Sequence, residues 1–231
     1  MEIGIVVFPG SNCDHDCYQA VKQTDGLQPR FIWHGETDLG KVRAVILPGG
    51  FSYGDYLRAG AIARFSPVMK AVIEFARSGG VVFGICNGFQ VLTEAGLLPG
   101  TLRMNLNLRF ICREIVLTPL RTSTPVTTSL GNKKTFRLPI AHKMGNYFAD
   151  KDTVKALEEQ NRIVFKYCDE SGEITPQANP NGSINNIAGI CDETGRIVGM
   201  MPHPERRMNC FQPGVDGAHL FHSLKLFLNQ I

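Results

Sequence analysis

The chain has 231 residues, of which 43% are hydrophobic and 19% are charged, and its formal net charge is +3. This length and composition are typical of a globular protein with a sizeable core, and they exclude a disordered chain. The charge is too small to indicate nucleic acid or an anionic membrane as a partner. No apolar run approaches the length that a membrane span needs.

The N-terminal residues read as a first strand, MEIGIVVF, followed by Pro9 and Gly10. They have neither a basic region nor a cleavage site, so we expect no signal peptide. The seven cysteines are odd in number and widely spread, which does not indicate a disulfide framework. A reducing, cytoplasmic location is therefore expected. Cys13 and Cys17 lack a second pair at zinc-like spacing, so we expect no metal in this chain.

Five short apolar segments, rich in Val and Ile, are typical of parallel strands that are buried on both faces. They span residues 3–8, 31–33, 44–47, 81–85 and 197–201. Helical patterns lie between several of them: one capped by Ser11 or Asn12 and ending near Lys22, others at 67–77 and 87–95, and a last one at about 217–230. The alternation predicts an α/β fold with a doubly wound, mostly parallel sheet.

The middle of the chain, from about 101 to 195, has a different pattern. Strand-like segments at 112–117, 135–140, 163–167 and 186–191 follow one another without long helices between them. We interpret them as added antiparallel strands. Because they precede the last parallel strand, they interrupt one core and do not form a second one. We therefore expect a single domain over residues 1–231.

Residues 35–41, GETDLGK, nearly match a phosphate-binding loop. Val42 stands where that motif needs a hydroxyl, and Glu36 and Asp38 would repel phosphate. The segment also leads into the predicted strand at 44–47 and not into a helix, whose N-terminus would stabilise the phosphates. The sequence therefore does not predict ATP binding by this chain.

Cys86 lies between the buried strand at 81–85 and a predicted helix, and Gly84 and Gly88 flank it. The pattern G-x-C-x-G matches the strained nucleophile elbow with cysteine in place of serine. A helix beginning at Asn87 would favour a thiolate at its N-terminus. The alternative is a small, buried, inert cysteine.

His203 follows the last predicted core strand and is bracketed by two prolines that stiffen the turn. A thiol nucleophile needs a base, and Glu205 is close enough to orient the imidazole. Because parallel strands end at one edge of the sheet, His203 and Cys86 should meet there. The alternative is a loop histidine beside a surface glutamate.

The predicted strand at 44–47 ends in Pro48, Gly49 and Gly50 at the same edge. Adjacent glycines let backbone N–H groups approach a substrate. The N–H groups of Gly50 and Asn87 could thus form an oxyanion hole. The alternative is a simple glycine turn.

Three short motifs, PGG (48–50), GICNGFQ (84–90) and PHPE (202–205), together resemble class I, triad-type glutamine amidotransferases. Longer matches resemble the glutaminase subunit of phosphoribosylformylglycinamidine synthase. They are PGSNCD (9–14), PGGFSYGDYLRAGAIARF (48–65), LLPG (97–100), NPNGS (179–183), NIAGI (186–190) and GMMPHPER (199–206). One departure is AHKMGNYF (141–148), where Lys143 and Met144 replace the glycine and carboxylate of the family pattern Ala-His-Gly-Glu-Gly.

The resemblance implies a flavodoxin-like sheet and a glutaminase in which Cys86 attacks the glutamine amide, His203 moves the protons and Glu205 orients His203. It further implies that Gly49 and Gln90 help to hold glutamine. The released ammonia would pass to a large synthetase subunit that works with a small accessory subunit. That synthetase would hold ATP and magnesium and convert formylglycinamide ribonucleotide in purine biosynthesis. The expected contact residues for these partners are Phe51, Tyr53, Asp55, Tyr56 and Arg58. The alternative is that this loop contacts the substrate and has no partner role.

Two other functions use the same features. A stand-alone cysteine hydrolase, such as a γ-glutamyl hydrolase, would need the same triad, but the long match over residues 51–58 favours the synthase subunit. A non-catalytic regulatory protein could share the fold. Such proteins usually lose a triad member, and this chain keeps Cys86, His203 and Glu205.

Overall fold

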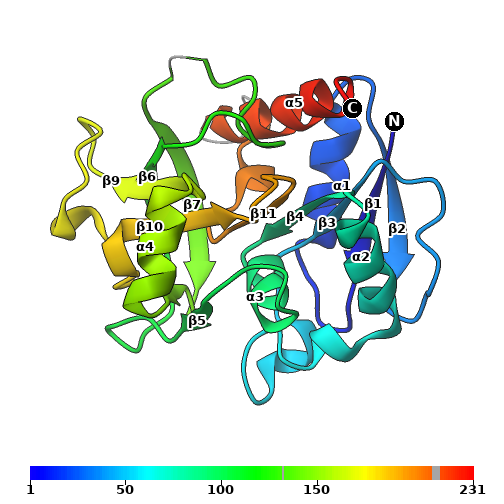
Figure 1. Ribbon diagram of the computed structural model, residues 1–231, viewed down its shortest axis with the longest axis horizontal. Helices are drawn as coiled ribbons and strands as arrows, with labels where there is room; N and C mark the ends of the chain where they lie inside the picture. The colour runs from blue at the N-terminus through cyan, green and yellow to red at the C-terminus, as the bar shows by residue number, and fades with distance from the viewer. Residues whose placement is uncertain (132, 210–213) are drawn as a thin grey trace.

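The computed structural model describes residues 1–131, 133–209 and 214–231 and contains one continuous nine-stranded sheet with helices packed beside it (Figure 1). Five neighbouring strands are parallel and follow the order β2-β1-β3-β4-β11. This is the flavodoxin-like order, so the predicted fold class is confirmed. Their bounds are β1 Glu2–Val7, β2 Gln28–Trp33, β3 Ala44–Leu47, β4 Val81–Ile85 and β11 Ile197–Met200.

The strands of the middle segment extend the same sheet in the order β10-β9-β6-β7, and each pairs antiparallel with its neighbours. Their bounds are β6 Ile111–Pro119, β7 Phe136–His142, β9 Ile163–Cys168 and β10 Ile187–Cys191. The prediction of added antiparallel strands is confirmed. A second, two-stranded sheet of β5, Thr101–Arg103, and β8, Asn146–Phe148, was not predicted, because strands of three residues carry too little pattern.

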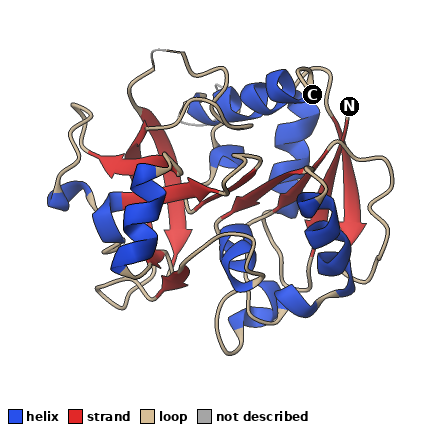
Figure 2. Cartoon of the chain, viewed as in Figure 1, coloured by secondary structure: helices blue, strands red, loops and turns tan. Residues whose placement is uncertain are grey.

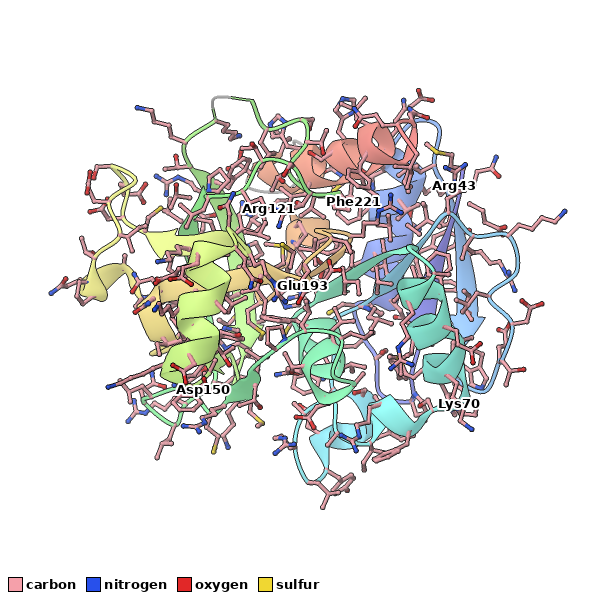
Figure 3. All side chains as sticks on the ribbon, in the orientation of Figure 1. Arg43, Lys70, Arg121, Asp150, Glu193 and Phe221 are labelled. Carbon is pink, nitrogen blue, oxygen red and sulfur yellow. The ribbon has the colours of Figure 1, made fainter. Side chains whose placement is uncertain are left out.

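The helices cover the parallel strands on both sides, with α1 and α5 together on one side and α2 and α3 on the other (Figures 1 and 2). Their bounds are α1 Asp14–Gln23, α2 Pro67–Arg77, α3 Asn87–Glu94 and α5 Asp216–Leu228. Strands β3, β4 and β11 are buried at every residue, as their uninterrupted apolar sequence predicts. Phe221 of α5, labelled in Figure 3, places its ring centroid 6.5 Å from that of Phe83 in β4.

Two expectations about helices were wrong. Helix α1 begins at Asp14, and the residue before it is Cys13, not a capping Ser11 or Asn12. Ser11 instead forms a β-bridge with Gly50, which ties the turn after β1 to the loop after β3. The middle segment also contains a nine-residue helix, α4, over Lys151–Glu159, with the Asp150 side chain accepting from the Thr153 N–H at 2.8 Å.

None of the described helices is both long and apolar enough to cross a membrane. Six cysteines lie in the described ranges and all are free thiols, whereas Cys210 lies outside them.

The packing of α3 against β3 generates the first prediction. A Cβ on Gly88 would overlap the backbone carbonyl of Leu47, which cannot move without distorting β3. Gly88→Ala should therefore lower the free energy of unfolding by about 3 kcal/mol. Urea denaturation measures the loss.

Gly96→Ala is the matched control at the other end of the same helix. No atom lies within 4 Å of a Cβ built there, and only the positive φ of +70° opposes alanine. This variant should lose about 1 kcal/mol. Equal losses in the two variants would show that the approach of α3 to β3 does not limit residue 88.

Candidate active site

Four neighbouring parallel strands bring the predicted site residues to one edge of the sheet. The chain leaves β3 into Gly49 and Gly50, β4 into Cys86, and β11 into the turn of His203. Strand β1, on the other side of β3, leads into Cys13. The carboxyl edge of a doubly wound sheet is where such folds bind ligands.

Cys86 has φ +51° and ψ −104°, a strained conformation for a residue other than glycine. It is 4% exposed and stands directly before α3. A Cβ on Gly84 would come within 2.7 Å of the Gly88 carbonyl oxygen, so glycine at 84 is needed to close this turn. The strand, the strained residue and the helix give the geometry of a nucleophile elbow.

His203 and Glu205 form a buried pair, with 2.6 Å between His203 Nδ1 and Glu205 Oε1. The His203 N–H donates to the carbonyl of Pro139 in β7 at 2.9 Å, which fixes the turn. Burial alone would lower the pKa of His203, but the charges of Glu205 and Cys86 outweigh it and hold that pKa well above its ordinary value. The imidazole therefore keeps a proton, which it can deliver to a leaving group.

The two predicted oxyanion donors both have N–H groups outside regular pairing. Asn87 is the first residue of α3, so the helix provides no acceptor for its N–H. In the bridge beside Gly50 the bonds run from the N–H of Phe51 to Gly10 (3.2 Å) and from that of Cys13 to Gly49 (3.3 Å). The N–H of Gly50 takes no part in them.

Gly49 lies against His203, because a Cβ there would come within 2.7 Å of the imidazole Cε1. Gln90, by contrast, lies in the wall of a small cavity beside Cys86. Its Oε1 accepts from Asn87 Nδ2 at 2.8 Å, and its Nε2 donates to the carbonyl oxygen of Met144 at 2.6 Å. Of the two residues expected to hold substrate, Gln90 thus lines the cavity, whereas Gly49 packs against the His203 ring and does not line it.

This cavity, which we call the thiol cavity, is lined by Gly50, Phe51, Asp55, Cys86, Gln90, Ala141, His142, Lys143 and Met144. Its volume is about 30 Å³, which leaves room for a water or two and not for an amino acid.

The segment after β7, which departs from the family pattern, forms one wall of the thiol cavity. Asn105 fixes this segment. Its N–H donates to the Lys143 carbonyl at 2.8 Å, and its Oδ1 lies 3.0 Å from the Gly145 N and 3.1 Å from His142 Nδ1. Since Met144 contacts Gln90 through its carbonyl oxygen, the changed side chain leaves that contact in place.

Sequence reasoning missed His142 and Cys13. Burial, followed by the charge of His203, lowers the pKa of His142 to about 4, so this cavity residue is neutral at neutral pH. Cys13 lies beside His203, and Arg206 Nη2 is 3.0 Å from its sulfur. The position of Cys13 in the turn after β1 was a usable signal, because the neighbouring strands β3, β4 and β11 also lead into site residues at this edge.

Cys13, His203 and Glu205 are also the one group in the described ranges whose ligand atoms lie close enough to hold a metal ion, all within 4.8 Å of one another. The guanidinium of Arg206 next to Cys13 opposes a cation there.

The five residues expected at a partner interface divide into two sets. Phe51 and Tyr56 are exposed, at 44% and 73%, and their side chains make no hydrogen bond within the described ranges, whereas Arg58 is exposed but paired. The other three also bond within the chain. The Tyr53 hydroxyl lies 2.9 Å from His34 Nδ1, Asp55 Oδ1 accepts from Asn87 at 3.3 Å, and Arg58 donates twice to Glu94 at 2.6 and 2.7 Å.

A cysteine on a strained turn and a buried His–Glu pair, both at the carboxyl edge of a flavodoxin-like sheet, are the defining features of triad-type glutamine amidotransferases. The chain belongs to this class: residues 1–230 match the family of CobB/CobQ-like glutamine amidotransferase domains.

Two curated relatives are similar over almost the whole chain. The phosphoribosylformylglycinamidine synthase subunit PurQ of Chlorobium chlorochromatii is 54% identical over 96% of this chain and 95% of the relative. That of Salinibacter ruber is 52% identical over 96% of this chain and 94% of the relative. A chain in the solved structure of PurLQS from Thermotoga maritima superposes with a TM-score of 0.86 at 37% identity, covering 98% of both chains.

The His203–Glu205 pair generates the second prediction. Glu205→Gln should lower glutamine turnover at least about 100-fold, because the imidazole loses a stabilising charge and the amide NH2 can hold it in the wrong tautomer. Since the charge of Glu205 raises the pKa of His203, the alkaline limb of the kcat/KM profile should move to lower pH. Ammonia release measured from pH 5 to 10 checks both effects.

Glu205→Asp is the matched control, because it keeps the charge and should retain part of the activity and the wild-type alkaline limb. A fully active Glu205→Gln variant would contradict the orienting role.

Proposed function

We propose that this chain is the glutaminase subunit of phosphoribosylformylglycinamidine synthase. It hydrolyses glutamine to glutamate and ammonia and supplies the ammonia for the conversion of formylglycinamide ribonucleotide to formylglycinamidine ribonucleotide in purine biosynthesis. The observation that best supports this function is that Cys86 and the buried His203–Glu205 pair lie together at one edge of the sheet. The similarity to PurQ subunits over 96% of the chain supports this particular amidotransferase and not another.

In the first half-reaction, the Cys86 sulfur attacks the side-chain carbonyl carbon of glutamine. A C–S bond forms, and the electrons of the C=O bond move to oxygen. The backbone N–H groups of Gly50 and Asn87 stabilise that oxyanion. As the oxyanion collapses, the C–N bond breaks, and His203 delivers its proton to the leaving nitrogen, which departs as ammonia.

In the second half-reaction, His203 takes a proton from water as the water oxygen attacks the thioester carbonyl. The C–S bond then breaks and releases glutamate and the Cys86 thiolate. Glu205 holds the Nδ1 side of the imidazole in both steps, which leaves Nε2 free to exchange the protons. Gln90 positions the amide end of the substrate through its bonds to Asn87 and Met144.

The ammonia passes to a large synthetase subunit that assembles with this chain and a small accessory subunit, in line with the solved PurLQS complex. ATP and magnesium are used on the synthetase, and this chain carries no cofactor of its own. We place the exposed Phe51 and Tyr56 at the contact with these partners, with the loop that also holds Tyr53, Asp55 and Arg58. The free thiols are in keeping with a cytoplasmic location.

The closed thiol cavity generates the third prediction. A cavity of about 30 Å³ must widen to admit glutamine, and a partner that contacts residues 51–58 can hold it open. The isolated chain should therefore hydrolyse glutamine slowly. Adding the synthetase, the accessory subunit and their nucleotides should raise turnover at least about 10-fold. Equally high turnover without partners would favour the stand-alone hydrolase.

The fourth prediction separates chemistry from assembly. Cys86→Ala should abolish synthesis from glutamine and leave synthesis from added ammonia intact, because only the glutaminase step needs the thiol. Cys112→Ala, at an exposed cysteine in β6, should retain both activities. Loss of the ammonia-dependent activity in Cys86→Ala would mean that this cysteine serves folding or assembly.

A further inference from the structure

The thiol cavity carries two opposite charges that the glutaminase mechanism does not use. Among its lining residues, Asp55 is the carboxylate and Lys143 is the ammonium. They come from different parts of the chain, Asp55 from the loop after β3 and Lys143 from the turn after β7. Cys86 lies in the same cavity, so a substrate bound to the thiol can extend to both charges.

Glutamine brings a matching pair of charges to this cavity. When its side-chain amide is at Cys86, its α-ammonium and α-carboxylate lie three carbons away, and each needs a partner once it leaves water. We propose that Asp55 binds the α-ammonium and Lys143 the α-carboxylate, so that the two residues select a free amino acid as the amide donor. The inference rests on the proposed glutaminase function and names what that site recognises.

The loop around Asp55 is built to hold that carboxylate at the cavity. Tyr53, Asp55 and Leu57 all have positive φ, between 53° and 68°, which is uncommon for residues other than glycine and costs about 1 kcal/mol each. Tyr53 anchors the loop, since its N–H donates to the Pro9 carbonyl at 2.6 Å and its hydroxyl lies 2.8 Å from Ser66 Oγ. A chain that needed only a connection between β3 and α2 would not keep three strained residues.

The surroundings of Asp55 leave it short of a positive partner. Its Oδ1 accepts one long bond from Asn87 Nδ2, at 3.3 Å, and no cation of the described ranges forms an ion pair with it. The nearby Arg58 is bound to Glu94. Burial raises the pKa of Asp55 to about 6, and the bond from Asn87 only partly offsets this. An ammonium group is the ligand that would stabilise this carboxylate best.

Lys143 is exposed at the cavity wall, and its ammonium makes no hydrogen bond or ion pair with another residue of the described ranges. Its backbone is held, because the Lys143 carbonyl accepts from the Asn105 N–H at 2.8 Å. The turn is therefore fixed while the ammonium stays available for an anion.

Three substrates and two variants test the assignment in the assembled complex with the synthetase and accessory subunits. Glutamine has both α-groups, 4-carbamoylbutanoate lacks the ammonium, and 4-aminobutanamide lacks the carboxylate. Asp55→Asn should lower kcat/KM for glutamine and for 4-aminobutanamide about 10- to 100-fold, mainly through KM, and leave kcat/KM for 4-carbamoylbutanoate nearly unchanged. Lys143→Met should lower the value for glutamine and 4-carbamoylbutanoate about 5- to 10-fold and spare 4-aminobutanamide.

Asp152→Asn on α4 and Lys70→Met on α2, exposed residues outside the cavity, are the matched controls and should match wild type on every substrate (Figure 3 labels Lys70). If Asp55→Asn lowers kcat/KM by the same factor for substrates with and without the α-ammonium, Asp55 only shapes the loop and the assignment is wrong. Likewise, an equal loss from Lys143→Met for substrates with and without the α-carboxylate would overturn the role of Lys143. Failure of the wild-type complex to release ammonia from glutamine would overturn the proposed function itself. Normal glutamine turnover without the selective losses would overturn only this inference.

Discussion

The parallel pairing of β3, β4 and β11 is the constraint on which the site depends. The register places Gly84 of β4 level with Leu47 on one side and with Gly199 on the other. Consequently the three strands end at the same level. The turns that carry Gly49, Cys86 and His203 each begin within one or two residues of that level. A slip of one residue would move a strand end by about 3.3 Å and turn its side chains to the other face. No catalytic geometry would survive that.

The sheet was predictable from sequence because burial on both faces leaves a simple signature. Every parallel strand was located, but β2 only by its second half, because it begins with Gln28, Pro29 and Arg30 and buries only Ile32. The nucleophile and its base follow two of the fully buried runs. What escaped prediction depends on contacts between distant segments. Helix α4 had a cap at Asp150 and two buried apolar residues, Val154 and Leu157, but its short length hid it among strands. The inward aim of Asp55 depends on positive φ at residues that are not glycine, which no local pattern reveals.

The wall of the thiol cavity explains why the departure at Lys143 and Met144 is tolerated. Its contact to Gln90 is a backbone carbonyl, and the turn that carries this carbonyl is held by other side chains. Asn105 bonds both sides of the turn, and Asn181 Nδ2 donates to the Gly145 carbonyl at 2.8 Å. Asn181 belongs to the NPNGS motif, so that motif supports the cavity from behind without facing it. The Met144 side chain can thus vary while Gln90 keeps its backbone partner, and the same turn presents the Lys143 side chain to the cavity.

The triad and the cavity are built on parts of the structure with different stiffness. Cys86 and His203 stand on strand ends inside the parallel core, whereas Asp55 and Lys143 stand on loops at its surface. Phe51 joins the two regions, because it lines the thiol cavity and is also 44% exposed. A partner that packs on Phe51 therefore contacts the substrate site directly and needs no path through the sheet. The catalytic pair can therefore remain in position while the exposed Phe51 side of the cavity moves to admit glutamine.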